Sequence, residues 1–461
     1  MFSASFVNWI MYFFCIYLAK SKPFIYSAKV LVWGVNVSKR KVAIETLGCR
    51  LNISESGTFA DQFRERGYEI GKLRENVDVV LINTCCVTQK AEATCRNLIR
   101  KAKTKAKGAR IVVVGCYAQT AYEEIKKNLD VDLVLGSFEK SNLFKYLDEI
   151  EATDSIHVDK NKKFFSSRST KAEGHTRAFL KIQDGCNYVC SYCIIPRARG
   201  DSQSLPVADV IKEATLVLNE GFKEIIITGV NIGDYQDNSQ NLLDLIHKLL
   251  ELKKLERLRL SSIEPNILTK NFLSSIATNE KIMDHFHVPL QSGDDEILSK
   301  MRRKYNVKDY AQVINNIKKY FPSAGIGADV IVGFPGETDW HYQNTKKLIE
   351  SLPITHLHVF PFSKRKKTLA YNMPDEVNDK IKKDRVMELI ALGEKKINQF
   401  AKDQEGKTFK VLFEKRNKNG FFEGFTPNFL NVLQETNEDL NNQVKEVKIK
   451  QAIQNDLIGE F

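Results

Sequence analysis

Between residues 41 and 135, apolar residues gather in short, nearly continuous runs separated by amphipathic stretches. The apolar runs are Val42–Leu47, Val77–Asn83, Ile111–Val114 and Val131–Leu135. Helical patterns lie over Ser54–Arg66 and Thr88–Lys107. Buried strands that alternate with helices are typical of a parallel sheet covered on both faces. We therefore predict a parallel α/β domain over residues 41–153.

A second series of strand-like segments extends from residue 172 to residue 403. The segments are Phe179–Gln183, Glu224–Thr228, Arg257–Ser261, His285–Pro289, Asp329–Gly333 and His356–Phe360. This succession predicts a partial (β/α) barrel, in which functional residues follow the carboxyl ends of the strands. Any one of these strand ends alone could form an ordinary turn. Together they supply the candidate cofactor-binding residues Gly229, Asn231, Ser261, Glu264, Gln291 and Gly333.

The three remaining stretches differ in composition from these regions. Residues 1–40 contain no Asp or Glu, and their apolar run Phe6–Ala19 is shorter than the roughly 20 residues of a membrane span. We expect a leader outside the fold, with a weak interfacial anchor or a structural extension as alternatives. Residues 154–171 are polar and serine-rich, which indicates a linker. Residues 404–461 contain short strands that predict a small five-stranded β barrel.

The net charge of the chain indicates what kind of partner it binds. The chain has 69 Lys and Arg against 57 Asp and Glu, a net charge of +12, which favours an anionic partner such as nucleic acid. Its 43% hydrophobic and 27% charged residues exclude a disordered chain and a polytopic membrane protein. Basic residues concentrate in residues 88–110 and in the run Lys364, Arg365, Lys366 and Lys367. We expect both stretches to flank a cleft and contact RNA phosphates, although a charged run can also be a solvated face.

Three cysteines, Cys49, Cys85 and Cys116, each follow one of the first three apolar strands. Because carboxyl ends of parallel strands meet at one sheet edge, the three thiols should converge. Three thiolates can hold three irons of a [4Fe–4S] cluster, whereas a structural zinc normally takes four ligands. The alternative is a set of small buried thiols. We expect neither Cys86, adjacent to Cys85, nor Cys95, inside a predicted helix, to be a ligand.

A second cysteine triad, Cys186, Cys190 and Cys193, lies directly after a predicted strand with the spacing C-x3-C-x2-C. No histidine follows at zinc-finger spacing, so the triad fits three irons of a [4Fe–4S] cluster. This segment resembles the radical S-adenosylmethionine (SAM) superfamily. In that superfamily the open iron chelates SAM, whose reductive cleavage yields a 5′-deoxyadenosyl radical, and the cofactor carries the difficult chemistry.

The order of the two motif sets resembles the methylthiotransferase family. The motifs GCRLN, NTC and GCYAQ precede GCNYVCSYCIIPRARG, HVPLQSG, MRRKY and DVIVGFPGET. ETLGCRLN and TPNFLNV resemble the branch that acts on N6-threonylcarbamoyladenosine in tRNA, and the tail resembles the tRNA-binding TRAM domain. The resemblance implies that Cys49, Cys85 and Cys116 hold a first cluster that carries sulfur. A second cluster, on the C-x3-C-x2-C triad, would generate the radical that takes hydrogen from C2 of the adenine.

The resemblance thus implies a cytoplasmic enzyme with two [4Fe–4S] clusters and SAM. It would convert N6-threonylcarbamoyladenosine beside the anticodon to the 2-methylthio form. Its partners would be a tRNA anticodon stem-loop, a small electron-donor protein and an unidentified sulfur donor, without stable membrane association. The alternatives are the same reaction on isopentenyladenosine tRNA or a ribosomal protein, or a non-catalytic iron–sulfur protein that binds tRNA or acts as a sensor. No side chain is assigned as a general acid or base.

Overall fold

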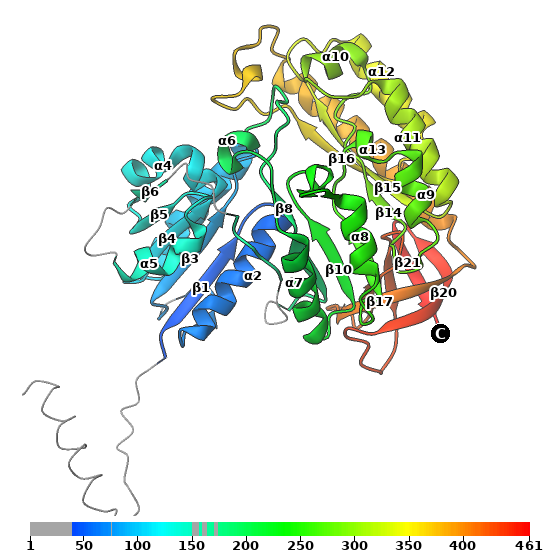
Figure 1. Cartoon of the computed structure of the whole chain (residues 1–461). Helices are drawn as coiled ribbons and strands as arrows, with labels where there is room; N and C mark the ends of the chain where they lie inside the picture. Colours follow the sequence, from blue (N-terminus) through cyan, green and yellow to red (C-terminus); the bar gives the residue numbers. More distant parts are fainter. Residues whose placement is uncertain (1–38, 75, 150–155, 159–163, 170–173) are drawn as a thin grey trace, which may run out of the picture. The chain divides into compact units, whose positions relative to one another are not determined.

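A computed structural model describes residues 39–74, 76–149, 156–158, 164–169 and 174–461, of which residues 40–461 belong to one compact unit. The predicted leader, residues 1–40, lies almost entirely outside the described residues. Figure 1 traces the compact unit from a blue and cyan α/β part, through a green and yellow partial barrel, to a red β barrel. Among the described helices, none has both the length and the apolar character needed to cross a membrane.

The N-terminal part is a six-stranded, all-parallel sheet, as the apolar runs predict. The strand order is β2-β1-β3-β4-β5-β6. Its strands are β1 (Lys41–Thr46), β2 (Glu69–Gly71), β3 (Val79–Thr84), β4 (Arg110–Gly115), β5 (Leu133–Leu135) and β6 (Ile156–His157). Helices α2 (Arg50–Glu65) and α5 (Leu143–Asp148) bury their apolar sides on one face. Helices α3 (Gln89–Lys105) and α4 (Cys116–Leu129) cover the other face.

The described part of the predicted linker is packed rather than free. Ile156 and His157 form β6, the sixth strand of the sheet. Phe165 is buried, and its ring stacks on Phe59 of α2 with centroids 5.1 Å apart. Arg168 forms an antiparallel bridge with Leu180 of the central part. This segment therefore contacts both the N-terminal sheet and the partial barrel.

The central part is a partial (β/α) barrel of six parallel strands in two groups of three. The first group contains β7 (Arg177–Lys181), β10 (Glu224–Thr228) and β13 (Arg257–Leu260). The second contains β14 (His285–His287), β15 (Gly325–Val332) and β16 (His356–Pro361). A parallel bridge between Leu258 and Ile282 connects the groups. Alternate strand residues point outward into an apolar core. That core is shared with α7 (Val207–Asn219), α8 (Leu242–Leu250), α9 (Lys270–Ile276), α11 (Val307–Tyr320), α12 (Asp339–Ser351) and α13 (Asp379–Lys402).

The C-terminal part is a closed five-stranded barrel in the order β17-β18-β19-β21-β20, which confirms the predicted architecture. The strands are β17 (Thr408–Arg416), β18 (Phe422–Phe425), β19 (Asn431–Gln434), β20 (Val444–Ile453) and β21 (Asp456–Glu460). Phe422 belongs to the barrel core. Phe425 stacks on Phe429 with centroids 5.1 Å apart, so both aromatic rings have structural roles.

The loop between β18 and β19, residues 426–430, meets the amino-terminal end of the partial barrel. Its Phe429 ring lies 4.6 Å from the ring of His285 and 4.9 Å from the guanidinium carbon of Arg259. Arg257 donates to the carbonyls of Lys410 (2.8 Å) and Phe425 (3.1 Å), and Arg259 to those of Pro427 (3.0 Å) and Thr426 (3.4 Å). The small barrel thereby closes the end of the partial barrel opposite the strands' carboxyl ends.

Candidate active site

The first cysteine triad lies at the carboxyl edge of the N-terminal sheet. Cys49 follows β1, Cys85 follows β3, and Cys116 opens α4 directly after β4. All three line one cavity of about 730 Å³. Asn52 Nδ2 donates to the carbonyls of Leu47 (2.6 Å) and Thr84 (3.1 Å) and so ties the loops of Cys49 and Cys85 together. The sheet edge thus gathers three thiols from three strands around one space.

The thiols of this triad differ in their surroundings. Cys86 donates a hydrogen bond to Cys116 and lowers the pKa of that thiol to about 6, and Arg199, with Nε 3.2 Å from Cys116 Sγ, acts in the same direction. Burial raises the pKa of Cys85 to about 12. Cys95 is buried, with its Sγ 3.4 Å from the carbonyl oxygen of Cys85. Cys86 and Cys95 therefore support the triad from the core without lining the cavity.

The second triad, Cys186, Cys190 and Cys193, lines a cavity of about 390 Å³ at the carboxyl end of β7. Arg303 Nη1 donates to Cys190 Sγ at 3.2 Å, and the backbone N–H of Tyr188 donates to Cys186 Sγ at 3.3 Å. Burial raises the pKa of Cys186 to about 11 and that of Cys193 to about 12. These two thiols therefore need a bound cation to become thiolates at neutral pH.

The spread of the sulfur atoms suits a cluster better than a single ion. Within the described chain, the side chains that bring three ligand atoms within 4.8 Å of one another are His287, Asp329 and His358, and neither cysteine triad does so. A zinc ion gathers all its ligands around one point, whereas an iron–sulfur cube places each thiolate on a separate iron. The donor set of each triad, three thiols without a converging fourth ligand, therefore fits a [4Fe–4S] cluster.

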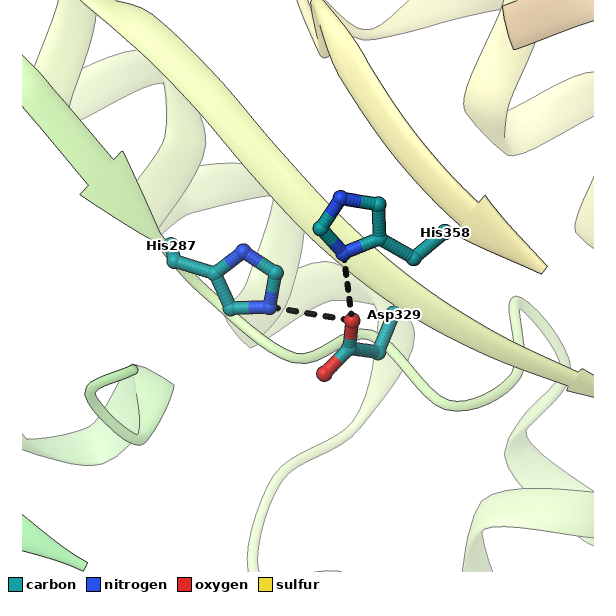
Figure 2. A group of neighbouring side chains, drawn as sticks. All are labelled: His287, Asp329 and His358. Atoms are coloured by element: carbon teal, nitrogen blue, oxygen red, sulfur yellow. Dashed lines mark hydrogen bonds and ion pairs between the residues drawn. The ribbon is translucent and has the colours of Figure 1, made fainter. Parts of the chain in front are cut away.

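His287 of β14, Asp329 of β15 and His358 of β16 meet inside the partial barrel (Figure 2). Asp329 Oδ1 lies 3.0 Å from His287 Nε2 and 3.1 Å from His358 Nδ1. Burial alone would raise the pKa of Asp329, but the hydrogen bonds from both imidazoles hold it well below its usual range. One oxygen of the carboxylate, Oδ1, thus contacts both rings.

The two cavities adjoin. Both are lined by Val87, Ile195, Val230, Ser262 and Asp329. Because these residues are shared, the two cysteine triads face neighbouring parts of one space inside the carboxyl end of the partial barrel. A substrate placed there would lie between the two triads.

Five of the six predicted cofactor-binding residues line this space. Gly229 and Ser261 line the cavity of the first triad, and Asn231, Glu264 and Gln291 that of the second. Ser261 Oγ and both polar atoms of the Asn231 amide are buried and have no hydrogen-bond partner in the described chain. Orphaned polar atoms of this kind fit a site built for a polar ligand.

Gly333 lies elsewhere, since it lines neither cavity. Its φ of +72° favours glycine, and a Cβ there would come within 2.2 Å of the Lys382 side chain of α13. Its N–H donates to Glu337 Oε1 at 2.8 Å. The absence of a side chain at Gly333 therefore makes room for α13.

The basic run Lys364–Lys367 lies beside the start of α3, and the two segments line a cleft of about 790 Å³. Gln89 of α3 donates from its backbone N–H to Ser363 Oγ at 3.0 Å. Arg365 is buried and ion-paired with Glu92, and Lys364 pairs with Glu376 at 2.9 Å. Lys366 and Lys367 are exposed. The run therefore offers two exposed lysines, while Arg365 fastens it to α3.

Sequence reasoning missed a buried charge cluster behind the first triad. The fully buried Glu55 carboxylate of α2 contacts Lys140 Nζ (2.5 Å), Lys181 Nζ (3.1 Å) and Arg199 Nη1 (3.0 Å). Asp184 also contacts Lys181 (2.5 Å) and Arg199 (3.0 Å). The pattern gave no sign of this cluster, because Glu55 falls among polar positions of a helix that would ordinarily face solvent. The cluster joins α2 of the N-terminal part to β7 of the partial barrel.

Comparison with known proteins identifies the families of the N-terminal and central parts. Residues 41–136 match the family described as "Uncharacterized protein family UPF0004", and residues 180–349 match the Radical SAM superfamily. The threonylcarbamoyladenosine tRNA methylthiotransferase MtaB of Bacillus subtilis (strain 168) is 35% identical over 423 residues, which cover 89% of this chain and 94% of the relative. The chain belongs to the radical SAM methylthiotransferase family. It is therefore an enzyme, and the non-catalytic alternative is wrong.

Members of this methylthiotransferase family are named for different nucleosides. The tRNA-2-methylthio-N6-dimethylallyladenosine synthase of Clostridium tetani (strain Massachusetts / E88) is 32% identical to this chain and covers 90% of it, with 95% of the relative aligned. Among solved structures, a radical SAM methyltransferase from Kitasatospora setae, with cobalamin and a [4Fe–4S] cluster bound, superposes with a TM-score of 0.55. It is 14% identical, with 72% of this chain and 77% of that chain covered, so this likeness shows the fold alone.

Proposed function

We propose that this enzyme converts N6-threonylcarbamoyladenosine, next to the anticodon of tRNA, to its 2-methylthio form. The observation that carries the proposal is the pair of cysteine triads that face one space inside the partial barrel. Relatives named for the threonylcarbamoyl substrate are 33–36% identical to this chain and cover 80–89% of it. The dimethylallyl substrate of other relatives is the rival that the experiments below must exclude.

In this proposal Cys49, Cys85 and Cys116 hold one [4Fe–4S] cluster, and Cys186, Cys190 and Cys193 hold a second one that binds SAM. Bound in this way, the clusters and SAM supply the one-electron chemistry, the sulfur and the methyl group of the reaction. A small electron-donor protein and a sulfur donor would serve the enzyme in the cytoplasm.

The chain's own residues position the reactants. Arg303 donates to Cys190 Sγ and pairs with Glu264, so it fixes the cysteine loop against the wall of the partial barrel. The Asn231 amide and the Ser261 hydroxyl, both buried without partners in the described chain, are free to bind polar groups of SAM or the nucleoside. Val87, Ile195 and Val230 lie where the cavities meet. Their apolar surfaces would keep water from reactive species there.

The cleft beside α3 suits the phosphate backbone of the anticodon stem-loop. Lys366 and Lys367 are exposed at its rim, and Lys90 and Arg96 of α3 also line it. Cations placed along such a cleft gain binding free energy from counterion release when they contact phosphates. We propose that the stem-loop lies along this cleft while the modified adenine enters the space between the triads.

Mass spectrometry of tRNA nucleosides tests the substrate directly. Cells that lack the gene should lose 2-methylthio-N6-threonylcarbamoyladenosine and accumulate N6-threonylcarbamoyladenosine, and a plasmid copy should reverse both changes. A copy with Cys186, Cys190 and Cys193 replaced by Ala should not reverse them. Loss of a 2-methylthio derivative of dimethylallyladenosine instead would assign the protein to the rival substrate.

Iron analysis tests the two-cluster assignment. The anaerobically reconstituted enzyme should contain about eight irons per chain, four for each [4Fe–4S] cluster. Replacing either triad with Ala should leave about four, whereas Cys95→Ala should leave the number unchanged. About four irons in the parent enzyme would contradict the assignment.

A further inference from the structure

Arg50 is a cation without a partner in the cavity of the first triad. It is the first residue of α2, directly after Cys49, and lines the same cavity as Cys49, Cys85 and Cys116. In the described chain its half-buried guanidinium forms no hydrogen bond or ion pair. The ring centre of Phe179 lies 6.0 Å from its guanidinium carbon.

The other arginines that line the two cavities are paired with carboxylates. Arg199 contacts Asp184 at 3.0 Å, and Arg303 is ion-paired with Glu264. Buried cations are normally paired in this way, because the loss of hydration is otherwise uncompensated. Arg50 lines the cavity without a hydrogen bond or ion pair to any anion of the described chain.

The neighbouring carboxylates are already engaged. Glu224 contacts Arg257 at 2.6 Å and Arg259 at 2.7 Å. Asp329, which also lines the cavity, contacts both His287 and His358 through Oδ1. Apart from the cluster proposed for Cys49, Cys85 and Cys116, an anion that pairs with Arg50 would therefore have to come from a molecule that enters the cavity.

The two nucleosides in the relatives' names differ in whether they carry an anionic group. Both present the same adenine C2, but the threonylcarbamoyl group ends in a carboxylate and a hydroxyl, whereas the dimethylallyl group is a hydrocarbon. A guanidinium binds a carboxylate with two parallel hydrogen bonds and gains nothing from a hydrocarbon. Ser261, whose hydroxyl lacks a partner in the described chain, lines the same cavity and adds to its polar character.

We propose that Arg50 binds the carboxylate of the threonylcarbamoyl group and so makes the enzyme prefer this nucleoside over dimethylallyladenosine. The inference rests on the proposed function, because it assigns a residue to the recognition of that substrate. Arg50 is a specificity-determining residue in this role, since it contacts the side group and not the reacting carbon.

The test compares the reconstituted holoenzyme with Arg50→Gln, Arg50→Lys and a control, Arg64→Gln. Arg64 lies on the same helix, pairs with Asp61 at 2.8 Å on the partly exposed side, and does not line the cavity. The substrates are tRNA with threonylcarbamoyladenosine, the same tRNA with that carboxylate as a methyl ester, and tRNA with dimethylallyladenosine. Methylthiolation is followed by mass spectrometry, and iron content and SAM cleavage are measured for every variant.

For threonylcarbamoyl tRNA we expect Arg50→Gln to raise KM about 10- to 100-fold, the range for a lost charge-assisted hydrogen bond, with a smaller change in kcat. Arg50→Lys should recover part of the loss, and Arg64→Gln should match the parent enzyme. On the methyl ester, the parent and Arg50→Gln should perform alike, because the charge that Arg50 recognises is gone.

Three outcomes separate the inference from the function on which it rests. A parent enzyme that does not modify threonylcarbamoyl tRNA refutes the proposed function before any variant is compared. A parent that does so, with an Arg50→Gln variant of unchanged KM, overturns the role of Arg50 alone. A variant that loses iron, or that loses activity equally on the ester, shows that Arg50 supports the cluster at Cys49 and likewise overturns its role in recognition.

Discussion

The buried charge cluster around Glu55 joins α2 to β7. Helix α2 follows Cys49, and β7 leads to the second triad. Replacing Glu55 with glutamine keeps the size of the side chain but removes the anion that faces three cations. Asp184 would still contact Lys181 and Arg199, but Lys140 would lose its only ion-pair partner in the described chain. A buried ammonium would then lack a counter-charge.

Removing one partner of a buried ion pair costs about 3–5 kcal/mol. We expect a loss of this size for Glu55→Gln, because Glu55 and the Lys140 side chain are at most 1% exposed. Burial lowers the pKa of Lys140 in the folded protein, so the folded state binds fewer protons than the unfolded state at high pH. The variant should therefore recover stability as the pH rises toward the ordinary pKa of lysine.

Hydrogen exchange of the reconstituted enzyme measures this loss locally, as the free energy of opening in α2 and β7. The matched control is Glu388→Gln. The Glu388 side chain is 43% exposed, pairs with Lys346 at 2.6 Å and accepts a hydrogen bond from Tyr342 that glutamine can also accept. This exposed pair should contribute at most about 1 kcal/mol. The double variant Glu55→Gln with Lys140→Met should recover part of the loss. Protection in Glu55→Gln equal to that of the control would refute the reasoning.

Other perturbations test the remaining features. The double variant Lys366→Glu with Lys367→Glu should weaken tRNA binding and flatten its salt dependence in filter-binding titrations. An unchanged slope of affinity against salt concentration would contradict phosphate contact. Phe429→Ala should destabilise the docking of the C-terminal barrel by about 2 kcal/mol, detected as faster proteolysis after α13. Equal proteolysis rates for the variant and the parent enzyme would argue against this contact. Burial lowers the pKa of His356 to about 4. Since the unfolded chain binds that proton first, the unfolding free energy should fall as pH decreases from about 6.5 to about 4, and His356→Gln should remove this part of the slope in urea titrations.

The central strands of the N-terminal sheet could be predicted from the sequence because they are buried on both faces. β3 is buried at every position, and β4 at every position but its first. Once the strands are placed, parallel topology alone predicts that Cys49, Cys85 and Cys116 meet at one edge. The short strands β2 and β6 escaped prediction because three or two residues give no periodic pattern.

Charged residues were harder to place, because a sequence pattern treats them as exposed. Arg365 belongs to a basic run, yet its side chain is buried against Glu92. Glu55 lies on a helix whose pattern leaves it on the polar side, yet it is fully buried beside cations from distant segments. Arg50 precedes the predicted helix start at Ser54, because nothing in the pattern shows that α2 begins directly after Cys49. The partners of Arg365 and Glu55 are remote in sequence, so only tertiary structure reveals them.

The contact between the small barrel and the partial barrel has a consequence for sequence divergence. Arg257 and Arg259 donate to backbone carbonyls of residues 410 and 425–427, which every amino acid possesses. Substitutions there change side chains but leave these acceptors in place, as long as the loop keeps its path. The outer surface of the small barrel can therefore change in sequence without loosening its attachment to the catalytic part.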